Sequence, residues 1–108
     1  MRVIAGQAKG RQLLVPKGKR VRPTTDRVRQ SLMDILAPWT VGRVWLDLYA
    51  GSGAVGIEAL SRGAHRVVFV ENDRRALWAL EANLRRTGLT AGAEIRRQSV
   101  SQALPVLA

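Results

Sequence analysis

Residues 44–56 run from an apolar segment directly into a glycine-rich turn. The segment 44–49 is apolar except for Asp47, and the turn after it reads Gly51-Ser52-Gly53-Ala54-Val55-Gly56. Apolar residues then resume at helical spacing until Gly63. A strand, a GxGxxG turn and a helix in this order are typical of a nucleotide-binding βα unit, because the glycines let the backbone turn tightly and approach a ligand.

Two further segments repeat the alternation of strand and helix. Residues 66–70 are β-branched and aromatic, as in a strand buried on both faces. Asp73 can cap a following helix that stops at Gly88. Residues 93–97 are interpreted as a third strand, and a further helix is expected from Ser101 onward. We therefore predict an α/β fold with about three parallel strands joined by right-handed crossovers.

An additional helix is predicted between Pro23 and Pro38. Thr24 or Thr25 can cap it, and Asp26 lies in its first turn. The helix carries an apolar stripe at helical spacing, which consists of Val28, Leu32, Ile35 and Leu36. We expect this stripe to pack against the rest of the domain.

Glu71 lies twenty residues after Gly51, at the end of the second predicted strand. An acid at this position can accept hydrogen bonds from both hydroxyls of a ribose. Two cofactor classes fit this spacing. One is a dinucleotide, whose pyrophosphate would lie at the helix N-terminus, and the other is S-adenosylmethionine, which carries a sulfonium, an ammonium and a carboxylate group.

Asp47 favours the second class. A carboxylate at the mouth of the turn would repel a pyrophosphate, whereas it can balance the cationic methionine end of S-adenosylmethionine. In the simpler interpretation, Asp47 caps local backbone amides and Glu71 is a solvated acid. A dinucleotide-dependent oxidoreductase remains an alternative.

Positive charge is concentrated at the N-terminus. The chain has 18 Lys and Arg residues against 8 Asp and Glu residues, and nine of these bases but only one of the acids fall within residues 1–30. Such clustering favours contact with a polyanion over a solvated tail. Short apolar runs around Gly6 and Gly10 predict a β-hairpin with Lys9 and Arg11 near its tip. Because no aromatic residue lies in it, we expect it to hold phosphates rather than stack on bases.

The predicted organisation is a basic arm over residues 1–24 followed by a cofactor-binding region over residues 25–108. The basic residues expected to contact RNA are Arg2, Lys9, Arg11, Lys17, Lys19, Arg20, Arg22 and Arg27. A non-enzymatic RNA-binding module would explain the arm alone and is a second alternative.

The composition argues against several kinds of site. Without cysteine the chain can form neither a disulfide nor a thiolate zinc site, and its one histidine, His65, is interpreted as a loop residue. We expect no metal. The uncharged runs are too short for a membrane span or a signal peptide, which predicts a cytoplasmic protein.

Several blocks of this sequence resemble the RsmD-type methyltransferases, which modify the exocyclic N2 of a guanine in 16S ribosomal RNA. The resemblance covers residues 1 to about 85 and is carried by the blocks Arg2-Val3-Ile4-Ala5-Gly6, Gly10-Arg11, Arg22-Pro23-Thr24-Thr25-Asp26-Arg27-Val28-Arg29, Leu46-Asp47-Leu48-Tyr49-Ala50-Gly51-Ser52-Gly53, Gly56-Ile57-Glu58-Ala59-Leu60-Ser61-Arg62-Gly63-Ala64 and Phe69-Val70-Glu71. It implies a Rossmann-like class I sheet, S-adenosylmethionine as methyl donor, and the small ribosomal subunit and its 16S RNA as partner.

The resemblance also implies roles for individual residues. Asp47 would lie near the methionine moiety, and Glu71 with Asn72 would hold the ribose. The residues expected beside the cofactor are Tyr49, Ala50, Gly51, Ser52 and Gly53. Those expected at the active-site mouth are Arg22, Thr24 and Arg27. Glu58 and Arg62, one helical turn apart, are interpreted as a surface ion pair.

Two departures from the family pattern stand out. The family usually has an acid after the third strand, near the adenine, where this chain has Gln98 and Ser99. The family's catalytic Asn/Asp-Pro-Pro-Tyr/Phe segment does not occur, so no catalytic residue is assigned and the isolated chain is expected to be inactive. We interpret the sequence as the N-terminal part of a methyltransferase whose first strand is an open sheet edge, although a partner could also cover that edge.

Overall fold

The computed structural model describes residues 1–15 and 24–107. Three parallel strands form one sheet in the order β1 (Val44–Asp47), β2 (Arg66–Val70) and β3 (Ala93–Arg96), with Leu46 opposite Val68 and Phe69 opposite Ile95. The helices are α1 (Thr24–Ile35), α2 (Ala54–Ser61), α3 (Arg74–Thr87) and α4 (Val100–Leu107), and 3-10 turns occupy Ala37–Trp39 and Thr90–Gly92. This arrangement confirms the predicted α/β class and the partial Rossmann-like sheet.

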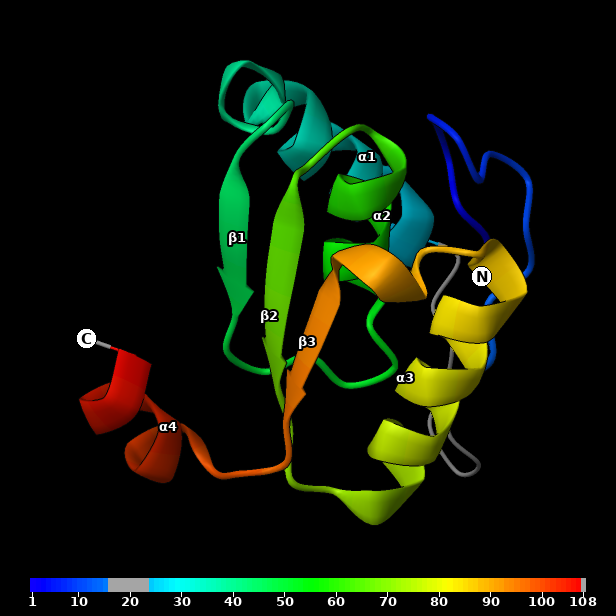
Figure 1. Ribbon diagram of the computed structural model, residues 1–108. Coiled ribbons are helices and arrows are strands. Elements are labelled where there is room, and N and C mark those ends of the chain that lie inside the picture. Colours follow the sequence, from blue (N-terminus) through cyan, green and yellow to red (C-terminus); the bar gives the residue numbers. More distant parts are fainter. Residues whose placement is uncertain (16–23, 108) are drawn as a thin grey trace.

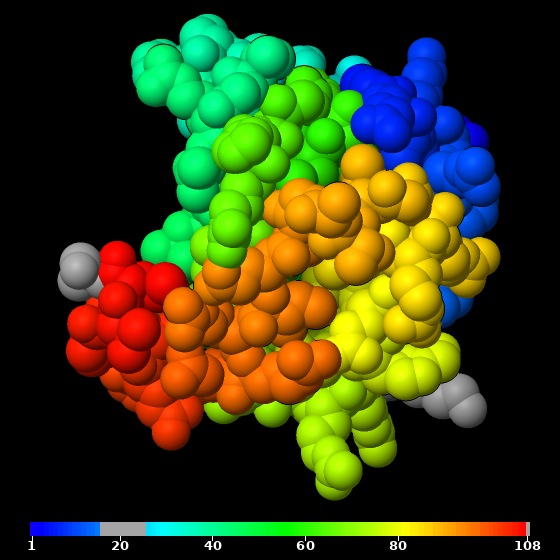
Figure 2. All heavy atoms as spheres, in the orientation of Figure 1, coloured from blue at the N-terminus to red at the C-terminus, as the bar shows by residue number. Residues whose placement is uncertain are grey.

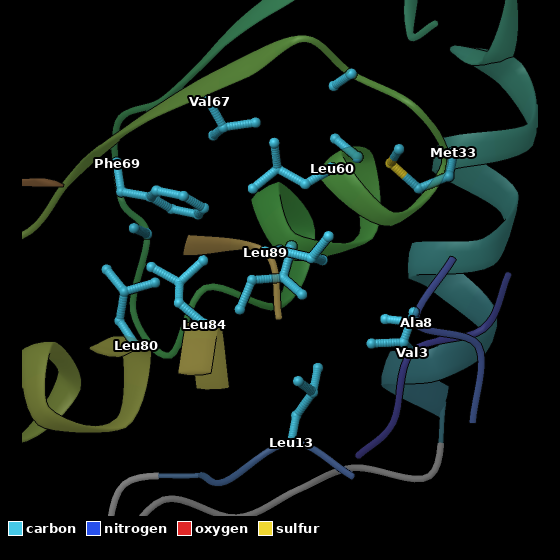
Figure 3. Close-up of a cluster of buried hydrophobic side chains, with 14 residues drawn as sticks. Val3, Ala8, Leu13, Met33, Leu60, Val67, Phe69, Leu80, Leu84 and Leu89 are labelled. Carbon is cyan, nitrogen blue, oxygen red and sulfur yellow. The ribbon is translucent and has the colours of Figure 1, made fainter. Parts of the chain in front are cut away.

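One face of the sheet packs on α2 and α3. Phe69 and Val67 of β2 are fully buried and meet Leu60 of α2 and Leu80 and Leu84 of α3 (Figure 3). The strands all point the same way, so their C-terminal ends lie together at the bottom of the sheet in Figure 1, where α4 follows β3.

The caps of α3 confirm the expectation from sequence. The carboxylate of Asp73 accepts a 3.0 Å hydrogen bond from the main-chain amide of Ala76, and Gly88 ends the helix with a left-handed φ of 71°. Both features depend on neighbours within a few residues.

The N-terminal segment, residues 1–15, folds back on itself with a single antiparallel bridge between Arg2 and Gln12 among its residues. This pairing is shorter than the hairpin expected from the sequence. Val3 and Ala8 are buried in the same core as Met33 of α1 (Figure 3), so the segment packs on the rest of the chain instead of projecting from it (Figure 2). The division of the chain at residue 24 stays a prediction, and both sides of it share one core.

The predicted orientation of α1 is wrong. Val28 and Ile35 are 65% and 70% exposed, whereas Arg29 and Met33 face inward and are 3% and 0% exposed. The face of α1 that packs inward is decided by α2, because the buried carboxylate of Glu58 on α2 requires a cation and Arg29 of α1 supplies one. Leu32 of the apolar stripe is also exposed, whereas Leu36, just after the helix, is half-buried. At the sheet, β1 lies at an edge as expected.

Residues 1–15 and 24–107 contain no helix that is both long and apolar enough to cross a bilayer.

Candidate functional site: a cavity at the ends of the strands

The glycine-rich turn connects β1 to α2 and brings the helix close to the sheet. Gly51 and Gly53 have φ angles of 55° and 87°, a region that favours glycine. A Cβ atom on Gly56 would lie 2.3 Å from Cε1 of Phe69. The first two glycines therefore shape the turn, and the third allows close packing of α2 on β2.

Glu71 follows β2 and holds the turn. Its Oε1 accepts a 2.7 Å hydrogen bond from the amide of Gly51, and its Oε2 accepts from the amides of Asn72 and Asp73 at 3.2 and 3.0 Å. A carboxylate offers about four acceptor positions, so about one remains for a ligand hydroxyl. Binding both hydroxyls of a ribose would require one of these amides to be released.

A cavity of about 330 Å³ opens at the C-terminal ends of the three strands. In open parallel sheets this edge is where ligands bind. Its polar lining consists of Tyr49, Glu71, Asn72, Gln98, Ser99 and Ser101, and its apolar lining of Leu48, Val70 and Val100. Asp47 and residues 50–53 do not line this cavity, although they flank its lining residues Leu48 and Tyr49 in the sequence. Val100 and Ser101 were not predicted, although their position four and five residues after the end of β3 is a signal that could have indicated them.

Asp47 is a half-buried acid at the end of β1. Burial raises the pKa of Asp47, the amides of Gly56 and Tyr49 oppose this rise, and the charge of Glu71 adds to it. Its Oδ2 atom is buried and has no hydrogen-bond partner among the described residues. A carboxylate in this state would gain from a cationic group placed beside it.

Gln98 and Ser99 differ in what they can offer to a ligand. The Oγ of Ser99 accepts from the amide of Gln102 at 3.3 Å, and Oε1 of Gln102 accepts from the amide of Ser99 at 3.0 Å. This is a reciprocal capping box at the start of α4. Oε1 of Gln98, in contrast, is buried without a partner among the residues the structure describes. Gln98 is therefore the freer acceptor of the two.

Glu58 is buried, which corrects its interpretation as part of a surface ion pair. It is 1% exposed, and its carboxylate accepts hydrogen bonds from the amides of Ile4 and Ala5 at 2.9 and 3.0 Å. Nε of Arg62 donates to it at 2.9 Å, and Nε of Arg29 lies 3.5 Å away. Glu58 thus fastens the N-terminal segment to α2, a role that local spacing did not indicate because Ile4 and Ala5 are distant in sequence.

Asn83 of α3 is a second buried residue that the sequence did not single out. Its Oδ1 accepts from the amide of Leu14 at 2.6 Å, and its Nδ2 donates to the carbonyls of Leu14 and Ser52 at 3.0 and 2.9 Å. One side chain therefore joins the end of the N-terminal segment to the glycine-rich turn.

The predicted RNA-contacting residues fall into three groups. Arg2, Lys9 and Arg27 meet at a groove of about 360 Å³ between the N-terminal segment and α1. Arg11 is exposed and does not line this groove. Lys17, Lys19, Arg20 and Arg22 lie outside the described residues, and Thr24 is described only as the first residue of α1.

Within residues 1–15 and 24–107 no group of three His, Cys, Asp or Glu side chains is arranged to hold a metal ion.

Comparison with known proteins places the chain in a family. The sequence profile of the family described as "Conserved hypothetical protein 95" matches residues 1–108. The chain is 50% identical over 84 residues to Ribosomal RNA small subunit methyltransferase D of Escherichia coli and 44% identical over 84 residues to the protein of that name from Haemophilus influenzae. Each alignment covers 78% of this chain but only 42% and 44% of the two relatives, so the chain spans less than half of their length.

A solved structure shows the same arrangement of elements. A hypothetical protein of Thermus thermophilus superposes with a TM-score of 0.82 at 41% identity, over 98% of this chain and 60% of that one. Since the family profile spans the whole sequence, the chain belongs to the RsmD family of ribosomal RNA methyltransferases.

Proposed function

We propose that this chain forms the S-adenosylmethionine-binding and RNA-contacting part of an enzyme that methylates the exocyclic N2 of a guanine in 16S ribosomal RNA. The observation that supports the proposal most directly is the cavity at the strand ends with two buried acceptors near it, Oδ2 of Asp47 and Oε1 of Gln98. The names of the relatives, which specify the small-subunit ribosomal RNA, support the RNA substrate.

The residues present fit this cofactor. The unpartnered carboxylate oxygen of Asp47 matches the ammonium group of the methionine moiety, and Oε1 of Gln98 matches the amino group of adenine. Glu71 retains acceptor capacity for a ribose hydroxyl, and Leu48, Val70 and Val100 supply apolar surface for the adenine ring. S-adenosylmethionine, when bound, supplies an electrophilic methyl group.

The acceptor side of the reaction requires groups that we assign to no residue of this chain. Guanine N2 is a weak nucleophile because its lone pair conjugates into the ring, so it must be oriented and brought within about 3 to 3.5 Å of the methyl carbon. The target base must also be unstacked. The family's Asn/Asp-Pro-Pro-Tyr/Phe segment, which the resemblance assigns to this task, is absent from the 108 residues. We therefore expect the isolated chain to bind the donor without transferring its methyl group.

Calorimetry on the 108-residue chain tests this proposal. The wild-type chain is expected to bind S-adenosylmethionine, and Glu71→Gln and Asp47→Asn to lower its affinity about tenfold, the magnitude of one hydrogen bond to a charged group. Asp34→Asn is a matched control, since this exposed acid on α1 lies outside the cavity lining.

Three outcomes would contradict the proposal. Binding of NAD in place of S-adenosylmethionine would indicate a dinucleotide enzyme. Methyl transfer to small-subunit RNA at an ordinary enzymatic rate would show that the acceptor site is already present. RNA binding that persists unchanged without residues 72–108, together with no affinity for either cofactor, would indicate a non-enzymatic RNA-binding module.

A further inference from the structure

We propose that the groove between the N-terminal segment and α1, here called the N-terminal groove, binds a backbone phosphodiester of RNA through Arg2, Lys9 and Arg27. This inference rests on the proposed function, because it assigns part of the RNA contact to one site. It assigns a phosphate contact to Lys9 but not to Arg11, whereas the charge clustering in the sequence predicted RNA contact for both residues.

The N-terminal groove gathers positive charge from segments that are distant in the sequence. Arg2 comes from the beginning of the N-terminal segment, Lys9 from its turn, and Arg27 from the first turn of α1. All three side chains are exposed. Asp26, the one acid among the described residues of the lining, lies 3.2 Å from Nη2 of Arg29, so part of its charge is already balanced. The groove therefore retains a net positive charge.

Buried contacts hold the walls of the groove in place. Arg29, which is 3% exposed, donates from Nη2 to the carbonyl of Arg2 and pairs with Asp26, so it links the N-terminal segment to α1 beneath the groove. Nε of the same Arg29 faces the buried carboxylate of Glu58 at 3.5 Å. Because these contacts fix the main chain at Arg2 and join it to α1 before any ligand arrives, less ordering entropy is lost on binding.

The size and lining of the groove favour a nucleic-acid backbone. A volume of about 360 Å³ is at the low end of ligand pockets, enough for one nucleotide unit. The arginine guanidinium groups can donate two parallel hydrogen bonds to phosphate oxygens, and the side-chain amide of Gln30 adds a neutral donor. No aromatic side chain of residues 1–15 and 24–107 lines the groove, so these residues offer a base no stacking surface there. Recognition at this site is expected to be independent of base sequence.

The test measures the affinity of the 108-residue chain for a fluorescently labelled small-subunit RNA fragment by anisotropy at several salt concentrations. Arg27→Gln, Lys9→Gln and Arg2→Gln are each expected to weaken binding several-fold and to reduce the slope of log affinity against log salt by about one. Arg11→Gln and Arg86→Gln are the controls. Both remove one exposed positive charge outside the groove, and Arg11 belongs to the same N-terminal segment. Their affinities are expected to stay within about twofold of wild type.

Two results would overturn the inference. Equal losses for the groove variants and for Arg11→Gln and Arg86→Gln would show that affinity follows net charge and not a site. In a parallel titration with inorganic phosphate at constant ionic strength, saturable binding that Arg27→Gln abolishes while RNA affinity stays unchanged would assign the groove to a free anion.

Calorimetry with S-adenosylmethionine on the same variants separates this inference from the proposed function. Each groove variant is expected to bind the donor like the wild type, which also shows that it is folded. If the wild type binds the donor and the groove substitutions leave RNA affinity unchanged, the groove inference alone fails. If the wild type does not bind the donor, the proposed function fails.

Discussion

The carboxylate of Glu58 accepts a 2.9 Å hydrogen bond from the main-chain amide of Ile4, 54 residues earlier in the chain. The same carboxylate faces Arg29 of α1 and Arg62, the residue that directly follows α2. Glu58 therefore connects three parts of the molecule: the N-terminal segment, α1 and the helix that follows the glycine-rich turn. The proposed RNA groove and the proposed cofactor site share this support.

Glu58→Gln is expected to lower the free energy of unfolding by about 3 kcal/mol, because it removes the buried anion that faces Arg29 and Arg62 and leaves the buried Arg29 with the partly exposed Asp26 as its anionic partner. Urea denaturation measures the change. Asp34→Asn, which removes the exposed partner of Arg62, is the control and is expected to cost less than about 1 kcal/mol. Equal stability of the two variants would show that the buried cluster contributes no more than a surface pair.

Asp47 is expected to make stability and donor binding depend on pH in opposite directions. Because burial raises its pKa in the folded state, its contribution to stability is present below the pKa of the unfolded chain and is lost as pH rises through the folded-state value. Asp47→Asn should therefore be more stable than wild type at neutral pH, with the difference disappearing in acid. Denaturation across a pH series measures this, and a variant that is less stable at neutral pH would contradict it.

The affinity for S-adenosylmethionine should rise with pH over the range in which Asp47 loses its proton, since only the carboxylate balances the ammonium group. Calorimetry in buffers of different ionisation enthalpy should detect protons released on binding in that range. Asp47→Asn should remove both the pH dependence and the proton release. If both persist in this variant, another group is responsible.

Gln98 and Ser99 should respond differently to substitution. Gln98→Leu removes the free buried acceptor and is expected to weaken S-adenosylmethionine binding about tenfold. Ser99→Ala breaks the capping box and is expected to destabilise α4 by about 1 kcal/mol, with donor affinity kept within about twofold. Calorimetry measures the affinities and circular dichroism the helix content. If Ser99→Ala loses more affinity for S-adenosylmethionine than Gln98→Leu does, the ligand contact belongs to Ser99 and not to Gln98.

Asn83→Ala should loosen two segments at once. It leaves the amide of Leu14 and the carbonyl of Ser52 without this partner, at an expected cost of about 2 kcal/mol in stability. Hydrogen exchange at the Leu14 amide should speed up markedly. Thr87→Val on the same helix is the control and should cost less than about 1 kcal/mol, because the Thr87 hydroxyl donates to the carbonyls of Asn83 and Leu84 of its own helix and, in the part of the chain that the structure describes, joins no second segment. An unchanged exchange rate at the Leu14 amide would show that Asn83 does not hold this segment in place.

The sequence by itself determined the features whose causes are local. The cap of α3 at Asp73 and its stop at Gly88 depend on hydrogen bonds and backbone angles within a few residues, and both were found where expected. The glycines of the turn were predictable for the same reason, because a positive φ favours glycine wherever the turn lies. The order of strands and helices followed from these local patterns and from the chirality of parallel connections.

Only the tertiary structure decided which surfaces meet. The apolar stripe of α1 was visible in the sequence, yet the helix packs through Arg29 and Met33, because the partner surface offers a buried carboxylate from a residue far along the chain. The joining of Leu14 to Ser52 through Asn83 and the meeting of Arg2, Lys9 and Arg27 have the same origin. Local spacing carries no information about such contacts, since the energy of each contact depends on the burial and the charge of both surfaces that meet.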